Sequence, residues 1–268
     1  MLVLHIGPPK TATSSLQKAL QTLPPPNIRY LGITQPRVPF DIVSSCESQY
    51  LAESLYLRCA YPAIDISCSA ALESIAAAAV SGCSIILSEE MFLVDNSPGL
   101  PWQEKLAWLY KLLSSFEPVP LVVIRHPLDA TESLCRELYI SLPWLFRLLP
   151  SLFPLSNTAR VYDYPCLLNT LLQAGYEDVI LVDFHALCTG LISSEQLLGR
   201  PPGGSSLQLP HENRSVKPAM ESRRSFRLLN PLFRFLLQGR VASYHAISAL
   251  LRSSHAGKYQ ISKILAIV

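Results

Sequence analysis

Short, uninterrupted apolar runs alternate with helical patterns along this chain, and that alternation limits the possible folds most strongly. Five segments have the character of short strands, most of them buried on both faces: residues 2–6, 30–33, 84–88, 121–124 and 179–184. Four segments between them have helical spacing instead: residues 14–23, 69–80, 102–116 and 128–138. Buried strands joined through helices form mostly parallel sheets that are covered on both faces. We therefore expect an α/β fold, a three-layer parallel sheet flanked by helices.

Length and composition favour one α/β domain with insertions. The chain has 268 residues, 49% of them hydrophobic and only 16% charged, which excludes intrinsic disorder. The longest stretch without a charged residue, 74–88, has 15 residues and is too short for a membrane span of about 20. We expect residues 1–212 to form the α/β domain, with an apolar, proline-broken lid or insertion at about 139–158. Residues 213–268 are expected to be a loop and helices packed on the same domain.

Cysteine spacing and the N-terminal residues indicate a reducing compartment. The seven cysteines are scattered singly, with no CxxC pair and no Cys/His cluster at metal-ligand spacing. The chain opens on an apolar run that is too short for a signal peptide and lacks a basic flank. We therefore expect a cytoplasmic protein without a bound metal.

The first apolar run leads directly into a loop suited to an anion. In LHIGPPKTATSSLQKAL, Lys10 and the hydroxyl residues Thr11, Thr13, Ser14 and Ser15 lie between strand and helix. Free N–H groups and the dipole at a helix start favour a negative ligand, and the lysine adds a full charge. The loop is not a Walker A sequence, because the second glycine of GxxxxGK[ST] is missing. An ordinary capped strand–turn–helix is the alternative interpretation.

This loop resembles the 5′-phosphosulfate-binding loop of the sulfotransferases that use 3′-phosphoadenosine 5′-phosphosulfate (PAPS). The resemblance implies that the cofactor is held by seven consecutive residues: Pro9, Lys10, Thr11, Ala12, Thr13, Ser14 and Ser15. Ala12 stands where that family most often has glycine. A methyl group there is tolerated only at negative φ, so we expect Ala12 to have a negative φ.

A second stretch resembles the 3′-phosphate site of the same family. The run 121–124 ends in Arg125, and Ser133 follows eight residues later on the next predicted helix. An arginine at a strand end can bind phosphate bidentately, and a serine on the following helix can reach the same oxygens. Alone, a strand-end arginine is more often a surface or ion-pair residue. The two motifs, in this order and 115 residues apart, support each other.

Sulfuryl transfer needs a base and a cation. Glu89 and Glu90 directly follow the run 84–88, and the family's strand–Ser–x–Glu pattern selects Glu90 as base, with Glu89 as the second candidate. A solvated pair of strand-end carboxylates is the structural alternative. His126, expected near the nucleotide, and His5, expected in the core, are rival bases. Lys10 is the cation for the charge that develops in transfer, so no metal is expected.

The end of the chain is strongly basic. Residues 213–268 carry a net charge of +9 and residues 1–212 a net charge of −7, although the total is only +2. Residues 211–218 (HENRSVKP) resemble an Asn-x-Ser-x-x-Pro stretch of some bacterial sulfotransferases, which implies that Arg214 and Lys217 contact the nucleotide. Two solvated basic residues are the alternative. The helical region beyond is either docked with a basic exposed face or a surface for an anionic acceptor or lipid headgroups.

Together, the two resemblances imply a PAPS-dependent sulfotransferase with P-loop NTPase-like topology and a helical, basic C-terminal region. PAPS would be the co-substrate and 3′-phosphoadenosine 5′-phosphate (PAP) the product. The acceptor would be a hydroxyl or amine on a small molecule, glycan or glycolipid, with a weak preference for carbohydrate. No nucleic acid partner is expected, and the oligomeric state stays open. The alternatives are a P-loop-like nucleotide kinase or phosphotransferase and a nucleotide-binding protein without catalysis.

Overall fold

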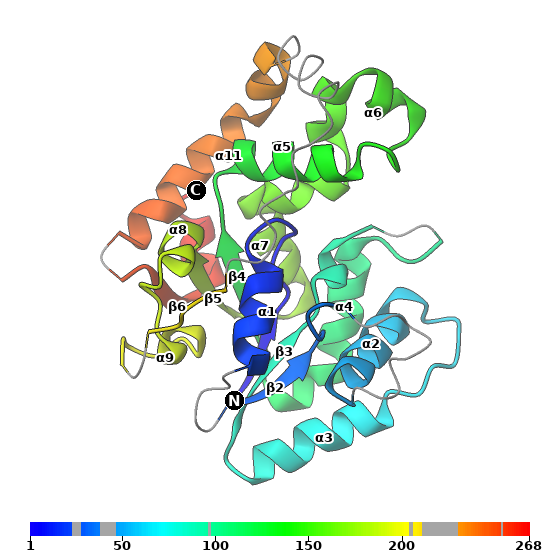
Figure 1. Cartoon of the computed structure of the whole chain (residues 1–268), viewed down its shortest axis with the longest axis vertical. Coiled ribbons are helices and arrows are strands. Elements are labelled where there is room, and N and C mark those ends of the chain that lie inside the picture. Colours follow the sequence, from blue (N-terminus) through cyan, green and yellow to red (C-terminus); the bar gives the residue numbers. More distant parts are fainter. Residues whose placement is uncertain (23–27, 38–46, 96–97, 204–205, 211–229, 253) are drawn as a thin grey trace.

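The fold is built on a six-stranded sheet with strand order β2-β3-β1-β4-β5-β6 (Figure 1). The computed structural model describes residues 1–22, 28–37, 47–95, 98–203, 206–210, 230–252 and 254–268. The strands are β1 Leu2–His5, β2 Ile28–Gly32, β3 Ser84–Ser88, β4 Val119–Ile124, β5 Asp178–Asp183 and β6 Ala256–Gln260. Strands β1 to β5 are all parallel to their neighbours, and β6 runs antiparallel to β5 at the edge.

Helices connect the strands and cover both faces of the sheet. The longer ones are α1 Thr13–Thr22, α2 Glu47–Ala60, α3 Ser69–Val80, α4 Trp102–Leu113, α5 Pro127–Leu138, α7 Tyr164–Ala174 and α11 Asn230–Leu250. The short α-helices are α6 Trp144–Leu148, α8 Phe184–Cys188, α9 Ser194–Leu197 and α12 Ile261–Leu265. The 3-10 helices are η2 Glu90–Leu93, η3 Ser114–Phe116, η4 Pro150–Leu155 and η5 Thr158–Tyr162. The expected flanked, mostly parallel α/β sheet is confirmed.

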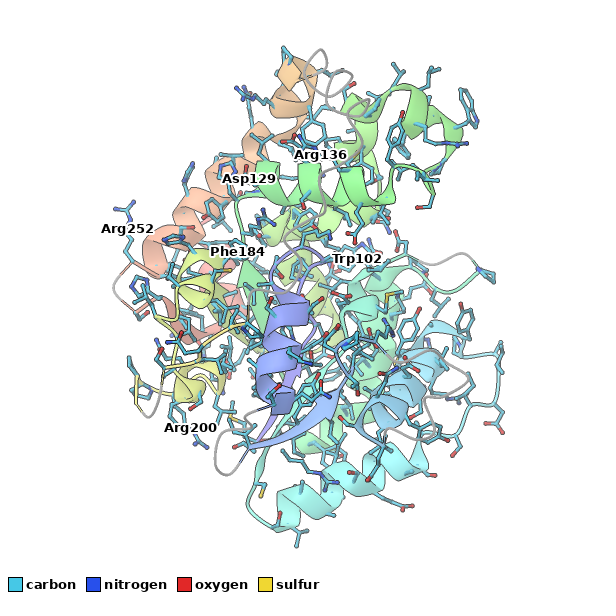
Figure 2. All side chains as sticks on the ribbon, in the orientation of Figure 1. Trp102, Asp129, Arg136, Phe184, Arg200 and Arg252 are labelled. Carbon is cyan, nitrogen blue, oxygen red and sulfur yellow. The ribbon has the colours of Figure 1, made fainter. Side chains whose placement is uncertain are left out.

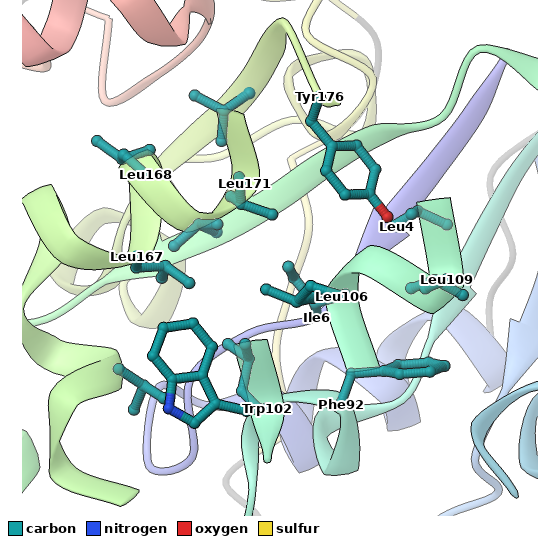
Figure 3. Packing of buried hydrophobic residues seen from close by; sticks show 14 of the residues in the cluster. Leu4, Ile6, Phe92, Trp102, Leu106, Leu109, Leu167, Leu168, Leu171 and Tyr176 are labelled. Carbon is teal, nitrogen blue, oxygen red and sulfur yellow. The ribbon is translucent and has the colours of Figure 1, made fainter. Parts of the chain in front are cut away.

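Alternate residues of each central strand enter two separate cores, which explains the uninterrupted apolar runs. Leu2 and Leu4 of β1 pack with α2, α3, α4 and α7 on one face, whereas Val3 packs with α1, α8 and α9 on the other. The same alternation occurs in β4 and β5. Figure 3 shows part of the larger core, where Trp102 and Leu106 of α4 meet Leu167 and Leu171 of α7.

The C-terminal region departs from the all-helical expectation. Its described residues form α11, α12 and the strand β6, which pairs with β5 from Asp178↔Gln260 to Val182↔Ala256. This part of the chain therefore extends the sheet as well as covering it. Within the described ranges, none of the helices reaches the length and hydrophobicity needed to span a bilayer.

The apolar segment 139–158 folds into the short helix α6 and 3-10 turns rather than one long helix, as its three prolines predict. It packs against α5 and α11. None of its residues lines the cavity described below, so the structure does not place it as a lid over that cavity.

Two glycines with positive φ test how tightly the larger core is packed. Gly175 ends α7 at φ +111°, and a methyl group there would lie 2.4 Å from the ring of Tyr110. Gly82 has φ +72°, and an added methyl would meet no atom within 4 Å. We expect Gly82→Ala to cost about 1 kcal/mol of unfolding free energy from backbone strain alone. Gly175→Ala should cost about 3 kcal/mol or more, because the Tyr110 ring must also move.

Urea denaturation of both variants measures the difference, with Gly82→Ala as the matched control. Equal losses would show that the contact between α7 and the Tyr110 ring is loose.

Candidate active site

A cavity of about 440 Å³ lies where the carboxyl ends of β1, β3, β4 and β5 meet. Nine residues that the sequence places in the site line it: Pro9, Lys10, Ala12, Thr13, Ser14, Ser15, Glu90, Arg125 and Ser133. The structure thus brings the loop after β1, the end of β4 and the middle of α5 around one space. Ligands of open α/β sheets bind at this edge.

Three consecutive carbonyl groups of the loop after β1 are held by side chains. The Thr11 hydroxyl donates to the carbonyl of Pro8, and the Tyr162 hydroxyl donates to that of Pro9. The Arg125 guanidinium donates to the carbonyl of Lys10, and all three distances are 2.6 Å. Thr11 is fully buried, and it is the one residue of the loop 9–15 that does not line the cavity. Its side chain shapes the turn instead of facing a ligand.

The loop backbone corrects the expectation for Ala12. Lys10 and Ala12 have φ values of +66° and +62°, both in the left-handed region that favours glycine. The prediction of a negative φ at Ala12 was therefore wrong, because the bonds to the preceding carbonyls hold the loop in this conformation despite the methyl group.

Helix α1 begins with donors that remain free for a ligand. The Ala12 carbonyl accepts the first helical bond, from Leu16 N–H at 2.9 Å. No acceptor in the described residues takes the N–H groups of Thr13, Ser14 or Ser15, all three of which line the cavity. The Thr13 hydroxyl is also buried there without a partner. Such a helix start is suited to an anion.

Arg125 is fixed from three sides. The Tyr164 hydroxyl accepts from Arg125 N–H at 2.8 Å and donates to the Arg125 carbonyl at 2.6 Å. The guanidinium lies 4.6 Å from the centre of the Phe184 ring and donates one N–H to Lys10. Its remaining N–H groups have no acceptor among the described residues, so they can bind an anion in the cavity.

Lys10 already has a partner inside the cavity. Its ammonium lies 2.5 Å from a carboxylate oxygen of Glu137, one turn after Ser133 on α5. The two side chains are 29% and 53% exposed, so the pair faces solvent. An anionic ligand that uses Lys10 must compete with Glu137 for it.

The structure separates the two adjacent glutamates. Glu89 is fully buried; its carboxylate accepts from Arg37 at 3.0 Å and from Met91 N–H at 2.9 Å, which caps η2. It does not line the cavity, whereas Glu90 does. Burial raises the pKa of Glu90, while Arg37 and Lys10 lower it and Glu137 raises it. Of these two glutamates, only Glu90 lines the cavity.

Neither histidine candidate lines the cavity. His5 is fully buried in β1, with its Nδ1 2.7 Å from the Ser88 hydroxyl, and burial lowers its pKa to about 4. The ring of His126 packs against the rings of Tyr244 and His245 on α11.

Five further residues complete the cavity wall: Glu137, Phe184, Cys188, Leu209 and Pro210. Two of them had a signal in the sequence. Phe184 follows the apolar run of β5 and so had to lie at the same sheet edge; Figure 2 shows it at the end of that strand. Glu137 is four residues after Ser133 and so on the same face of α5.

The remaining predicted contacts, Arg214 and Lys217, lie outside the described residues. Among the residues that are described, no group of three or more His, Cys, Asp or Glu side chains is placed to hold a metal ion. In comparisons with known proteins, no protein-family model, no curated protein and no solved structure matches the chain.

The left-handed conformation of Ala12 predicts a stabilising substitution. Ala12→Gly removes the clash of the methyl group at φ +62° and should raise the unfolding free energy by about 1 kcal/mol. Urea denaturation measures the change, and Ala19→Gly in the interior of α1 is the matched control, which should destabilise. If Ala12→Gly also destabilises, the loop does not have this conformation in solution.

Burial of Glu89 predicts a pH-dependent stability difference. Burial raises the pKa of Glu89 from 4.5 to about 7, although Arg37 and the Met91 N–H oppose the shift. Between these values the folded protein binds a proton that the unfolded chain does not, so the buried carboxyl costs stability as the pH rises. Glu89→Gln removes that cost. Its stability relative to the wild type should therefore increase from pH 4.5 to 7, by about 1–3 kcal/mol.

Urea denaturation of both proteins across this pH range measures the difference. A difference that stays constant or falls would show that Arg37 and the Met91 N–H outweigh burial.

Proposed function

We propose that the protein is a PAPS-dependent sulfotransferase. The observation that carries the proposal is the joint lining of one cavity by the loop 9–15, by Arg125 with Ser133, and by Glu90. These are the elements that the resemblance assigns to the 5′-phosphosulfate, the 3′-phosphate and the base. The position of β1 between β3 and β4, with the anion loop following it, also supports the proposed P-loop NTPase-like topology.

In this proposal two sets of donors in the cavity bind two different anionic groups. The free N–H groups of α1 and the ammonium of Lys10 would hold the 5′-phosphosulfate. The unused N–H groups of Arg125 and the hydroxyl of Ser133 would hold the 3′-phosphate. Both contacts use donors that have no other hydrogen-bond acceptor in the described residues, except for Lys10, which must leave Glu137.

The chemistry follows as an in-line displacement. Glu90 takes the proton of the acceptor hydroxyl or amine as the acceptor atom forms its bond to sulfur. The bond between sulfur and the bridging phosphate oxygen breaks, and its electron pair leaves on PAP. Lys10 stabilises the negative charge that develops on that oxygen, which is a role that a metal fills in kinases.

The acceptor is a hydroxyl or amine of a small molecule, glycan or glycolipid. A carboxylate base at position 90 favours a carbohydrate hydroxyl, as the resemblance implies.

Calorimetric binding of nucleotides tests the proposal. PAP should bind at least about tenfold more tightly than AMP, because only PAP offers a 3′-phosphate to Arg125 and Ser133. Mg²⁺-dependent ATP binding without this preference would favour the kinase alternative. PAP binding without transfer of ³⁵S from labelled PAPS to any acceptor in a screen would favour the non-catalytic one.

Variants of the cavity should separate the assigned roles. Lys10→Ala should weaken PAP binding and abolish transfer, whereas Glu137→Gln should strengthen PAP binding because the ligand no longer competes for Lys10. Glu90→Gln should bind PAP but not transfer. Glu132→Gln on the same helix, where Glu132 pairs with Arg136 outside the cavity, is the matched control and should change neither property.

A further inference from the structure

Large apolar side chains are exposed together at one end of the molecule. Six of them, between 44% and 88% exposed, come from two separate stretches of chain: Ile140, Trp144, Leu148, Leu155, Leu232 and Phe235. We call this surface the apolar tip. Figure 1 shows α6 and the first half of α11 at the same end of the molecule, beyond α5. Exposed apolar surface of this kind marks an interaction site.

Packing contacts and hydrogen bonds hold the two stretches of the apolar tip against each other. The turns of η4 pack against both α6 and α11. Arg240 of α11 donates to the carbonyls of Pro154 and Ala159 at 2.8 and 2.9 Å. The rings of Phe146 and Phe153 pack edge to face beneath it, at 6.2 Å between centroids.

The charges within the two stretches that form the apolar tip have one sign. Residues 139–158 and 230–250 contain no acidic residue, and Arg147 and Arg234 are exposed among the apolar side chains. The neighbouring helix α5 has three acidic residues. Glu132 pairs with Arg136, Glu137 pairs with Lys10, and the exposed Asp129 lies 4.0 Å from His126. An occupant with both an apolar layer and negative charges fits this surface.

We infer that the apolar tip docks on the surface of a bilayer that contains anionic lipids. Exposed tryptophan and leucine side chains enter the boundary between headgroups and acyl chains, and arginines beside them bind the anionic headgroups. Such binding is peripheral, since it uses only the exposed side chains of the tip. It does not require the proposed enzymatic function.

Helix α5 connects the candidate active site to the apolar tip. Ser133 and Glu137 line the cavity, and Ile140 begins the tip within one further turn. Docking would therefore bring the cavity close to the headgroup layer. If the proposed function holds, this position favours an acceptor hydroxyl on a lipid headgroup, such as a glycolipid.

Co-sedimentation of the full chain with vesicles tests the inference. The protein should bind vesicles of phosphatidylcholine with phosphatidylglycerol and bind pure phosphatidylcholine much more weakly. Trp144→Ser combined with Leu148→Ser should lower the partition coefficient at least about tenfold. The matched control is Ile64→Ser combined with Leu191→Ser, two side chains that are 57% exposed elsewhere, and should bind as the wild type does.

Three outcomes would overturn the inference: no binding to anionic vesicles, equal loss in the control, or binding that the tip variant keeps. If the wild type and the control form a concentration-dependent dimer, the tip variant stays monomeric and no vesicle binding occurs, the tip binds a second copy of the chain instead. Unfolding midpoints of both double variants, measured alongside, check that the fold is intact. PAP binding is measured separately, so failure of the proposed function leaves this test unaffected.

Discussion

The site depends on three hydrogen bonds to consecutive carbonyls of the loop after β1, from Thr11, Tyr162 and Arg125. Because these side chains hold the carbonyls of Pro8, Pro9 and Lys10, the loop keeps a conformation in which the N–H groups that start α1 stay free for a ligand. The left-handed residues Lys10 and Ala12 cost about 1–2 kcal/mol each. Two neutral bonds at about 1 kcal/mol and one to a charged arginine at about 1.5–3 kcal/mol offset this strain.

Most of the sheet was predictable because buried parallel strands need apolar residues at consecutive positions, as in residues 84–88, which form β3 as expected. The edge strand β6 was not predicted because Ala256 is its only buried residue, so it has no apolar run. Helix α2 was not predicted for a different reason: its buried side includes the polar residues Gln49 and Glu53, and one carboxylate oxygen of Glu53 accepts from both Gln49 and Arg37. The hydrogen bonds from Arg37 to Glu53 join residues 16 positions apart, so a helical hydrophobic pattern within 47–60 does not reveal that Glu53 is buried.

The residues of the candidate site that directly follow strands were predictable, because the carboxyl ends of parallel strands lie at the same edge of the sheet. The roles of adjacent residues were not predictable in the same way. Glu89 turns inward to cap η2 and pair with Arg37, and this turn leaves Glu90 facing the cavity. The backbone of Ala12 was misjudged because its conformation is set by bonds from Tyr162 and Arg125, more than a hundred residues away.

The charged side chains that line the cavity nearly neutralise one another. Two cations, Lys10 and Arg125, and two carboxylates, Glu90 and Glu137, line it, so the site is close to neutral when ionised. A neutral site needs no bound counter-ion to persist, because Glu137 neutralises Lys10 directly. An entering anion that replaces this carboxylate exchanges one ion pair for another, and the partly exposed Glu137 can return to water at little cost. The Lys10 ammonium therefore has a carboxylate partner until a strong anion replaces Glu137.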